Sequence, residues 1–231
     1  MTTSGLALDP SALARRQLQV IFALDCSGSM QGDRIASLNY AMRTALPELA
    51  EVAAENPEID VRVRILRVAD QAEWQSETCL PAADYPWTDL KADGETNMGA
   101  ALELLGTALG KEAMTGRQLP PVLVLASDGL PTDDFEAGLA KFFAADFADA
   151  AVRVGIAIGT DADLGPLERF IRHPSAKPLR ANNATELVDR IKWATTAPVK
   201  AVSAPTNAPD PLASMGDRPQ PTGSSETEII W

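Results

Sequence analysis

The stretch LQVIFALDCSGSM, residues 18–30, joins an apolar run directly to a polar loop that contains a glycine. The apolar part, residues 18–24, has polar neighbours and the length of a buried strand. The loop after it places Asp25, Ser27 and Ser29 at the carboxyl end of that strand. Ligands bind at this edge in open α/β sheets. The stretch therefore predicts a buried strand and also the position of a candidate site.

Segments typical of strands alternate with segments typical of helices along the rest of the chain. Strands are predicted over residues 61–68, 122–126 and 152–158, and helices over residues 33–54, 98–109, 135–148, 164–171 and 185–194. Residues 73–80 are expected to pair antiparallel with strand 61–68. Strands joined by crossover helices form parallel sheets that are covered on both faces. We therefore predict a doubly wound, Rossmann-like α/β fold, with a mostly parallel sheet, helices on both faces and one antiparallel edge strand.

Composition divides the chain into three parts. Residues 1–16 are predicted to be an N-terminal extension, residues 17–197 the folded domain, and residues 198–231 a flexible, proline-rich tail that ends in the letters EIIW. The tail is either a disordered, solubilising extension or a short linear motif that docks on a partner. The second interpretation assigns partner binding to Ile229, Ile230 and Trp231, and phosphorylation to Thr222, Ser224, Ser225 and Thr227.

Charge and cysteine content limit the partners and the compartment. The 231 residues include 32 acidic and 20 basic side chains, for a formal net charge of −12. Such a surface repels phosphate backbones and anionic lipids, so we expect no nucleic-acid or membrane partner, whereas cations are attracted. The two cysteines form no CxxC pair, which indicates a reducing compartment. Since the N-terminus has no basic region followed by an apolar one, we expect a soluble, cytoplasmic protein.

Oxygen-bearing side chains recur where predicted strands end or helices begin. Asp128 follows the strand 122–126, and Thr96 opens the helix 98–109. If the strands 18–24 and 122–126 are neighbours, three loops bring two carboxylates and three hydroxyls together. These hard donors favour Mg²⁺, Ca²⁺ or Mn²⁺ over zinc or copper. An outside carboxylate from a partner would complete the ion's shell. The alternative is a turn whose Asp and Ser side chains cap the next helix.

Two charged clusters each have two interpretations. Asp133 and Asp134 either select basic partners at the rim of the site or, as we expect, cap the helix 135–148. Arg62, Arg64 and Arg67 either form a docking stripe or, as we expect, mark a solvated face that guards a sheet edge.

The DxSGS loop at residues 25–29, followed in order by Thr96 and Asp128, resembles the metal-ion-dependent adhesion site (MIDAS) of von Willebrand factor A (vWA) domains. The resemblance extends over residues 17–197. It implies a vWA fold and a divalent cation that an acidic residue of a protein partner completes. The metal ligands that it implies are Asp25, Ser27, Ser29, Thr96 and Asp128.

Four segments are similar to the TerY-like vWA proteins of bacterial tellurium-resistance and stress loci, namely residues 94–102, 126–134, 154–159 and 191–193. This similarity implies a cytoplasmic, non-catalytic scaffold that works with a PP2C-type phosphatase and a Ser/Thr kinase. Cys26 stands where that pattern usually has Thr or another small residue, and Ser127 replaces the common Thr before the Asp. Neither is a proposed ligand. Cys26 is either a redox-sensitive thiol or, as we expect, a small residue buried against the sheet.

Two other functions stay open at this point. Some vWA proteins are regulatory subunits of MoxR-like AAA+ ATPases, and the same carboxylates would suit a metal-dependent phosphoesterase. Phosphoesterase centres normally add further carboxylates, a base or a second ion. The single histidine, His173, lies in a predicted loop. We therefore expect a binding protein and not an enzyme.

Overall fold

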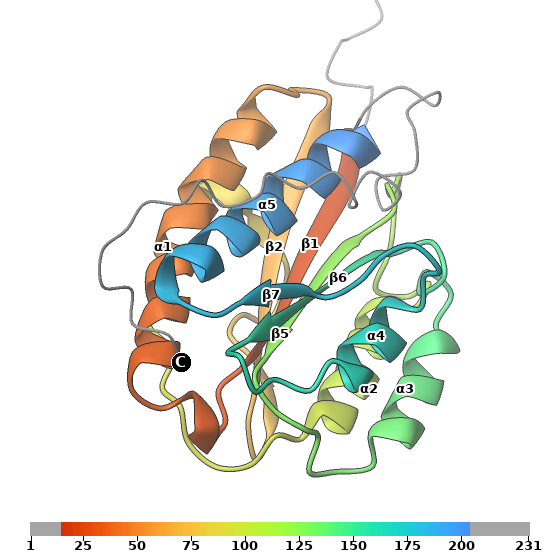
Figure 1. The fold of residues 1–231 in the computed structure, drawn as a ribbon. Coiled ribbons are helices and arrows are strands. Elements are labelled where there is room, and N and C mark those ends of the chain that lie inside the picture. Colours follow the sequence, from red (N-terminus) through yellow and green to blue (C-terminus); the bar gives the residue numbers. More distant parts are fainter. Residues whose placement is uncertain (1–14, 204–231) are drawn as a thin grey trace, which may run out of the picture.

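A seven-stranded sheet lies between two layers of helices in the computed structural model, which describes residues 15–203 (Figure 1). The strands are β1 (Arg16–Asp25), β2 (Ile59–Val68), β3 (Ala72–Trp74), β4 (Leu80–Pro81), β5 (Val122–Ser127), β6 (Val152–Ile158) and β7 (Leu179–Ala181). The helices are α1 (Asp33–Ala54), α2 (Met98–Ala108), α3 (Phe135–Phe143), α4 (Gly165–Ile171) and α5 (Ala184–Ser203). The strand order is β3-β2-β1-β5-β6-β7, and β4 also pairs with β2.

Helices cover both faces of the sheet. Helices α1 and α5 pack together on one face, and α2, α3 and α4 lie on the other (Figure 1). Phe142 of α3 and Phe170 of α4 are in contact, with ring centroids 5.6 Å apart. Strands β5 and β6 are buried along their whole length, as expected for strands covered on both sides. The predicted α/β class, with its mostly parallel sheet and antiparallel edge, is confirmed.

The antiparallel edge consists of two short strands, β3 and β4, where the sequence predicted a single strand. The arginines of β2 cover this edge. The guanidinium of Arg64 lies 3.9 Å from the ring centroid of Trp74 in β3. Arg62 donates to Asp60 at 2.8 Å and to the Cys79 carbonyl at 3.2 Å, and Arg67 pairs with Asp93. These side chains are engaged within the domain, in the arrangement expected of an edge-guarding face.

Two helix ends differ from the predicted ones. Helix α3 ends at Phe143, although its apolar pattern continues to Ala148. The buried Arg153 side chain donates to the carbonyls of Ala148, Ala151 and Ile171, so the chain leaves the helix and supplies acceptors.

Helix α5 continues to Ser203, past the expected domain boundary at residue 197, because Val199 is buried in the core. Residues 198–203 are therefore helical and not part of a tail. The predicted tail sites at 222–231 lie outside the described residues. Within residues 15–203, none of the helices combines the length and the apolar character needed to cross a bilayer.

Helices α2 and α3 approach each other through two glycines. A Cβ atom at Gly99 would lie 2.5 Å from the Asp134 carbonyl oxygen, and a Cβ at Gly138 would collide with the Gly99 backbone. Real Cβ atoms do not approach backbone this closely, so only glycine fits at either position. This contact matters for the site, because Thr96 precedes α2 and Asp128 precedes α3.

We expect Gly138→Ala to lower the free energy of unfolding by about 1–3 kcal/mol, the usual cost of overpacking. Urea unfolding followed by circular dichroism measures this loss. Gly110→Ala is the matched control, because a Cβ there would meet only the Thr107 carbonyl oxygen, at 3.4 Å. A Gly138→Ala protein as stable as the control would show that α2 and α3 can separate at no cost.

Candidate metal centre

Two aspartates lie at the same edge of the sheet because their strands are parallel neighbours. Strand β1 ends at Asp25, and β5 ends at Ser127, one residue before Asp128. The two strands pair in register up to Leu24 and Ala126. The site predicted from the sequence required these two strands to be neighbours, and they are. Asp25, Ser27 and Asp128 are buried, while Ser29 is exposed to solvent.

Asp25 is held by two hydrogen bonds from its own edge of the sheet. Its Oδ1 accepts from the Ser27 backbone N–H at 2.8 Å, and its Oδ2 accepts from Ser127 Oγ at 2.5 Å. Burial raises the pKa of Asp25 above its usual value, although both hydrogen bonds lower it. None of the ion pairs found within residues 15–203 includes this carboxylate. A buried carboxylate in this state favours the arrival of a cation.

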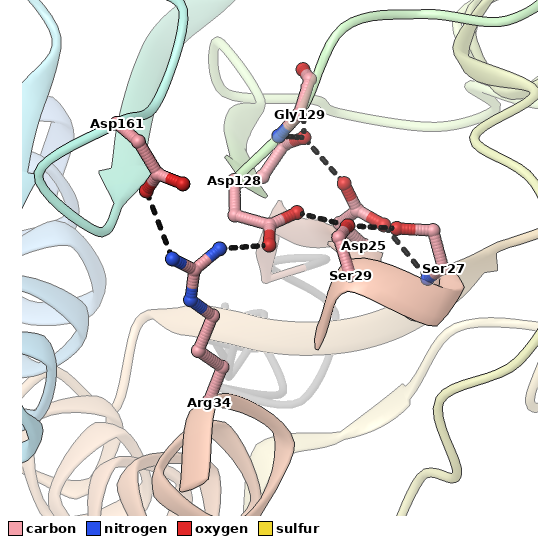
Figure 2. Close-up of polar contacts among 8 residues, drawn as sticks. Asp25, Ser27, Ser29, Arg34, Asp128, Gly129 and Asp161 are labelled. Atoms are coloured by element: carbon pink, nitrogen blue, oxygen red, sulfur yellow. Dashed lines mark hydrogen bonds and ion pairs between the residues drawn. The ribbon is translucent and has the colours of Figure 1, made fainter. Parts of the chain in front are cut away.

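A row of hydrogen-bonded oxygens connects the first loop to Asp128 (Figure 2). The hydroxyls of Ser27 and Ser29 are 2.9 Å apart, and Ser29 Oγ donates to Asp128 Oδ1 at 2.8 Å. The other oxygen, Asp128 Oδ2, accepts from Arg34 Nη1 at 2.5 Å. Burial alone would lower the pKa of Arg34, but its bonds to Asp128 and Asp161 raise it overall, so the guanidinium stays charged.

The third loop brings Thr96 to the same place. A Cβ atom at Gly129 would lie 3.8 Å from Ser29 Oγ and 3.9 Å from Thr96 Oγ1, so the two hydroxyls face one small region above Gly129. Two bonds of 3.0 Å fix the loop: Thr96 N–H donates to Thr132 Oγ1, and Thr132 N–H donates to the Thr96 carbonyl. The structure therefore brings all five predicted residues to one edge of the sheet.

The donors fit a hard divalent cation. Carboxylate and hydroxyl oxygens are the ligands that Mg²⁺, Ca²⁺ and Mn²⁺ prefer. Hydroxyls make up most of this donor set, with two carboxylates beside them. Consistent with this, no group of three or more His, Cys, Asp or Glu side chains gathers as a metal site among residues 15–203. When bound, the ion would supply a Lewis-acidic position that accepts an anionic oxygen.

Sequence reasoning assigned Asp133 to the wrong helix. The expectation was a cap on α3, but both Asp133 carboxylate oxygens accept from the first turn of α2, namely from the backbone N–H groups of Gly99 and Ala100, each at 2.8 Å. Asp134 caps α3 instead, through the Ala137 N–H. The spacing of Asp133 and Glu136 could not show that the donors belong to a helix more than thirty residues earlier.

Arg34 and Asp161 were missed, because their contacts join segments 127 residues apart and no local pattern signals such a pair. Ser127 was noted only as a departure from a family pattern, yet it is a direct hydrogen-bond donor to Asp25. Cys26 is fully buried, and burial raises the pKa of its thiol to about 12. A thiol with this pKa is not a nucleophile near neutral pH.

No protein-family model matches the sequence, and no curated protein matches it. Solved structures are similar to it in fold. The von Willebrand factor type A structure from Catenulispora acidiphila has a TM-score of 0.59 and 16% identity, and the match covers 79% of this chain and 42% of that one. The pilus adhesin SpaC from Lactobacillus rhamnosus GG gives 0.61 and 13%, over 81% and 30% of the two chains. Proximal thread matrix protein 1 from the mussel byssus, with a zinc-occupied MIDAS motif, gives 0.57 and 17%, over 79% and 48%.

These similarities establish that the described domain has the vWA fold, as the DxSGS resemblance implied. Identities of 13–17% are informative about the fold alone. In each of these three comparisons the match covers less than half of the solved chain.

We expect Asp25→Asn to raise the stability of the metal-free protein. Because burial holds the folded-state pKa of Asp25 above its unfolded value, the wild type loses stability as the pH rises through that folded-state pKa. In EDTA, the variant should exceed the wild type in unfolding free energy at pH 7, and the gap should shrink toward pH 4. Urea unfolding at several pH values measures it. Asp89→Asn, at an exposed aspartate, should show no such trend, and a gap that is constant with pH would contradict the assignment to Asp25.

Proposed function

We propose that this chain is a non-catalytic binding module that captures an acidic group of a partner protein through a bound divalent cation. Asp25, Ser27, Ser29, Thr96 and Asp128 would hold the ion, directly or through water. The observation that carries the proposal is the convergence of these oxygens at the end of β1 and β5, where Asp25 is buried without an ion pair within residues 15–203.

The donor set favours binding over hydrolysis. Two carboxylates balance a divalent ion formally, and hydroxyls add no negative charge. The ion therefore stays electrophilic toward a third carboxylate, especially where an aspartate binds only through water. Hydrolytic metal centres usually provide a base or a second metal beside the first.

The surroundings of the site suit a carboxylate on a protein partner better than a small free anion. Leu130, two residues after Asp128, is 60% exposed and is one of the two exposed large hydrophobic side chains among residues 15–203. An apolar side chain beside a charged anchor is typical of protein interfaces, where burial of the first adds affinity to the second. We therefore place Leu130 within the contact surface.

The finer assignment rests on the sequence. The segments 94–102 and 126–134, which resemble the TerY-like proteins, are also the segments that carry Thr96 and Asp128. On this basis we propose a cytoplasmic scaffold for a PP2C-type phosphatase and a Ser/Thr kinase in a bacterial stress or tellurium-resistance system. A MoxR-like AAA+ ATPase is the alternative partner.

We expect Mg²⁺ or Mn²⁺ to stabilise the wild type and to be required for capture of the candidate phosphatase or kinase. At a concentration of about 100 Kd, the ion should add about 2.7 kcal/mol of stability. Asp25→Ala should abolish both effects and leave the circular dichroism spectrum unchanged. Thermal unfolding with and without EDTA measures the first effect, and pull-down with each purified candidate measures the second.

Asp89→Asn serves as the control, because it removes an exposed carboxylate that pairs with Arg43 on the surface. Capture that survives both EDTA and Asp25→Ala would rule out the metal-mediated mechanism. Magnesium-dependent hydrolysis of p-nitrophenyl phosphate that is lost in Asp128→Ala would favour the phosphoesterase. Zn²⁺ is also tested in the thermal unfolding experiment, because the MIDAS motif of the mussel protein is occupied by zinc.

A further inference from the structure

Arg34 connects the candidate metal centre to a loop on the far side of Asp128. It lies in the first turn of α1, and its side chain, 15% exposed, points between two carboxylates (Figure 2). Nη1 donates to Asp128 Oδ2 at 2.5 Å, and Nη2 donates to Asp161 Oδ1 at 2.8 Å. Asp128 belongs to the proposed metal ligands, whereas Asp161 follows β6 and is 70% exposed.

The backbone after β6 accommodates this arrangement. Gly159 has a φ of +97°, which a side chain would strain. A Cβ atom there would lie 2.8 Å from Asp161 Oδ1 and 3.0 Å from Arg34 Nη2, the two atoms that form the ion pair. A glycine at this position therefore leaves room for the ion pair, which a side chain would disturb.

We propose that Arg34 lowers the affinity of the centre for a divalent cation through Asp128, and that Asp161 limits this effect. The inference rests on the proposed function, because it concerns the ion that the function requires. Asp128 is engaged at both oxygens, by Ser29 at Oδ1 and by Arg34 at Oδ2. An incoming cation therefore meets a carboxylate whose charge a guanidinium already balances, and it approaches that positive group as well.

Asp161 acts in the opposite direction. It accepts from the second Nη of Arg34 and so shares the positive charge that would otherwise fall on Asp128 alone. Without it, the cation would face a guanidinium with a single counter-ion. The arrangement also affects capture. The ion with two aspartates is formally neutral, and Arg34 adds a positive charge beside it that the exposed Asp161 offsets in part. That charge favours an anionic partner at the expense of tighter ion binding.

Isothermal titration calorimetry of the 231-residue chain with Mn²⁺ and with Mg²⁺ tests the proposal. Arg34→Met, which keeps the length and removes the charge, should tighten the Kd about tenfold. Arg34→Lys should stay near the wild type, since the charge is retained. Asp161→Asn should weaken binding about threefold. Changes of opposite sign within one ion-pair network are what an electrostatic role requires, whereas a purely structural role predicts weaker binding in both variants.

The pair Arg43 and Asp89 provides matched controls. Arg43 lies nine residues further along the same helix and pairs with an exposed aspartate at 2.6 Å. Arg43→Met and Asp89→Asn make the same changes in net charge as Arg34→Met and Asp161→Asn. Because this pair does not contact the candidate ligands, neither control should change the Kd noticeably. Equal effects at the two pairs would mean that overall charge alone is responsible, and would overturn the proposal.

The remaining outcomes separate this inference from the function on which it rests. If the wild type binds no divalent cation, both fail. If it binds one and Arg34→Met weakens binding, the module stands and the role of Arg34 is overturned. Should Arg34→Met not fold, the exposed site of Asp161→Asn decides alone, and unchanged or tighter binding there refutes the proposal.

Discussion

The parallel pairing of β1 with β5 brings two carboxylates to one edge of the sheet, and the rest of the site follows from that juxtaposition. A shift of one residue in this register would turn alternate side chains to the other face, and Asp25 would no longer lie beside Ser127. Burial of β5 on both faces fixes this register, because a slip would move each of its side chains out of the packing position that it fills. The hydrophobic core therefore determines the geometry of a polar centre.

Bringing like charges together has a cost that the loops reduce. Asp25 receives hydrogen bonds from Ser27 and Ser127, and Asp128 receives them from Ser29 and Arg34. The bonds to Asp25 favour its charged form and so offset part of the effect of its burial. Without a metal ion, a protein with such a site is less stable than it would be with neutral side chains at these positions. Metal sites in general share this property, because the ligands must be deprotonated before the ion arrives.

Aspartates outside the donor set hold the loops that present the ligands. Asp133 caps α2 and so fixes the start of the helix that Thr96 precedes. Asp70 holds the loop before α2, because its Oδ1 accepts from the Glu95 N–H, next to Thr96, at 2.5 Å. The acidic composition is therefore distributed between candidate ligands and backbone anchors, and net charge alone does not distinguish them. The proposed binding function would require rigid loops, because the open position of a bound ion has to stay aligned with the partner.

The sequence by itself determined the class of fold and the extent of α1 and β6, because these depend on local periodicity. It also singled out the five oxygen-bearing side chains of the candidate site, because they stand at strand ends and before a helix. It did not determine β7, which is only three residues long and too short for a pattern to show. Tertiary structure alone decided the end of α3, where Arg153 needs carbonyl acceptors, and the helix that Asp133 caps. It also decided the pairing of Arg34 with Asp128 and Asp161. Ion pairs between distant segments depend on the order of the strands and on the packing of the helices. Neither can be inferred from the residues that flank each partner in the chain.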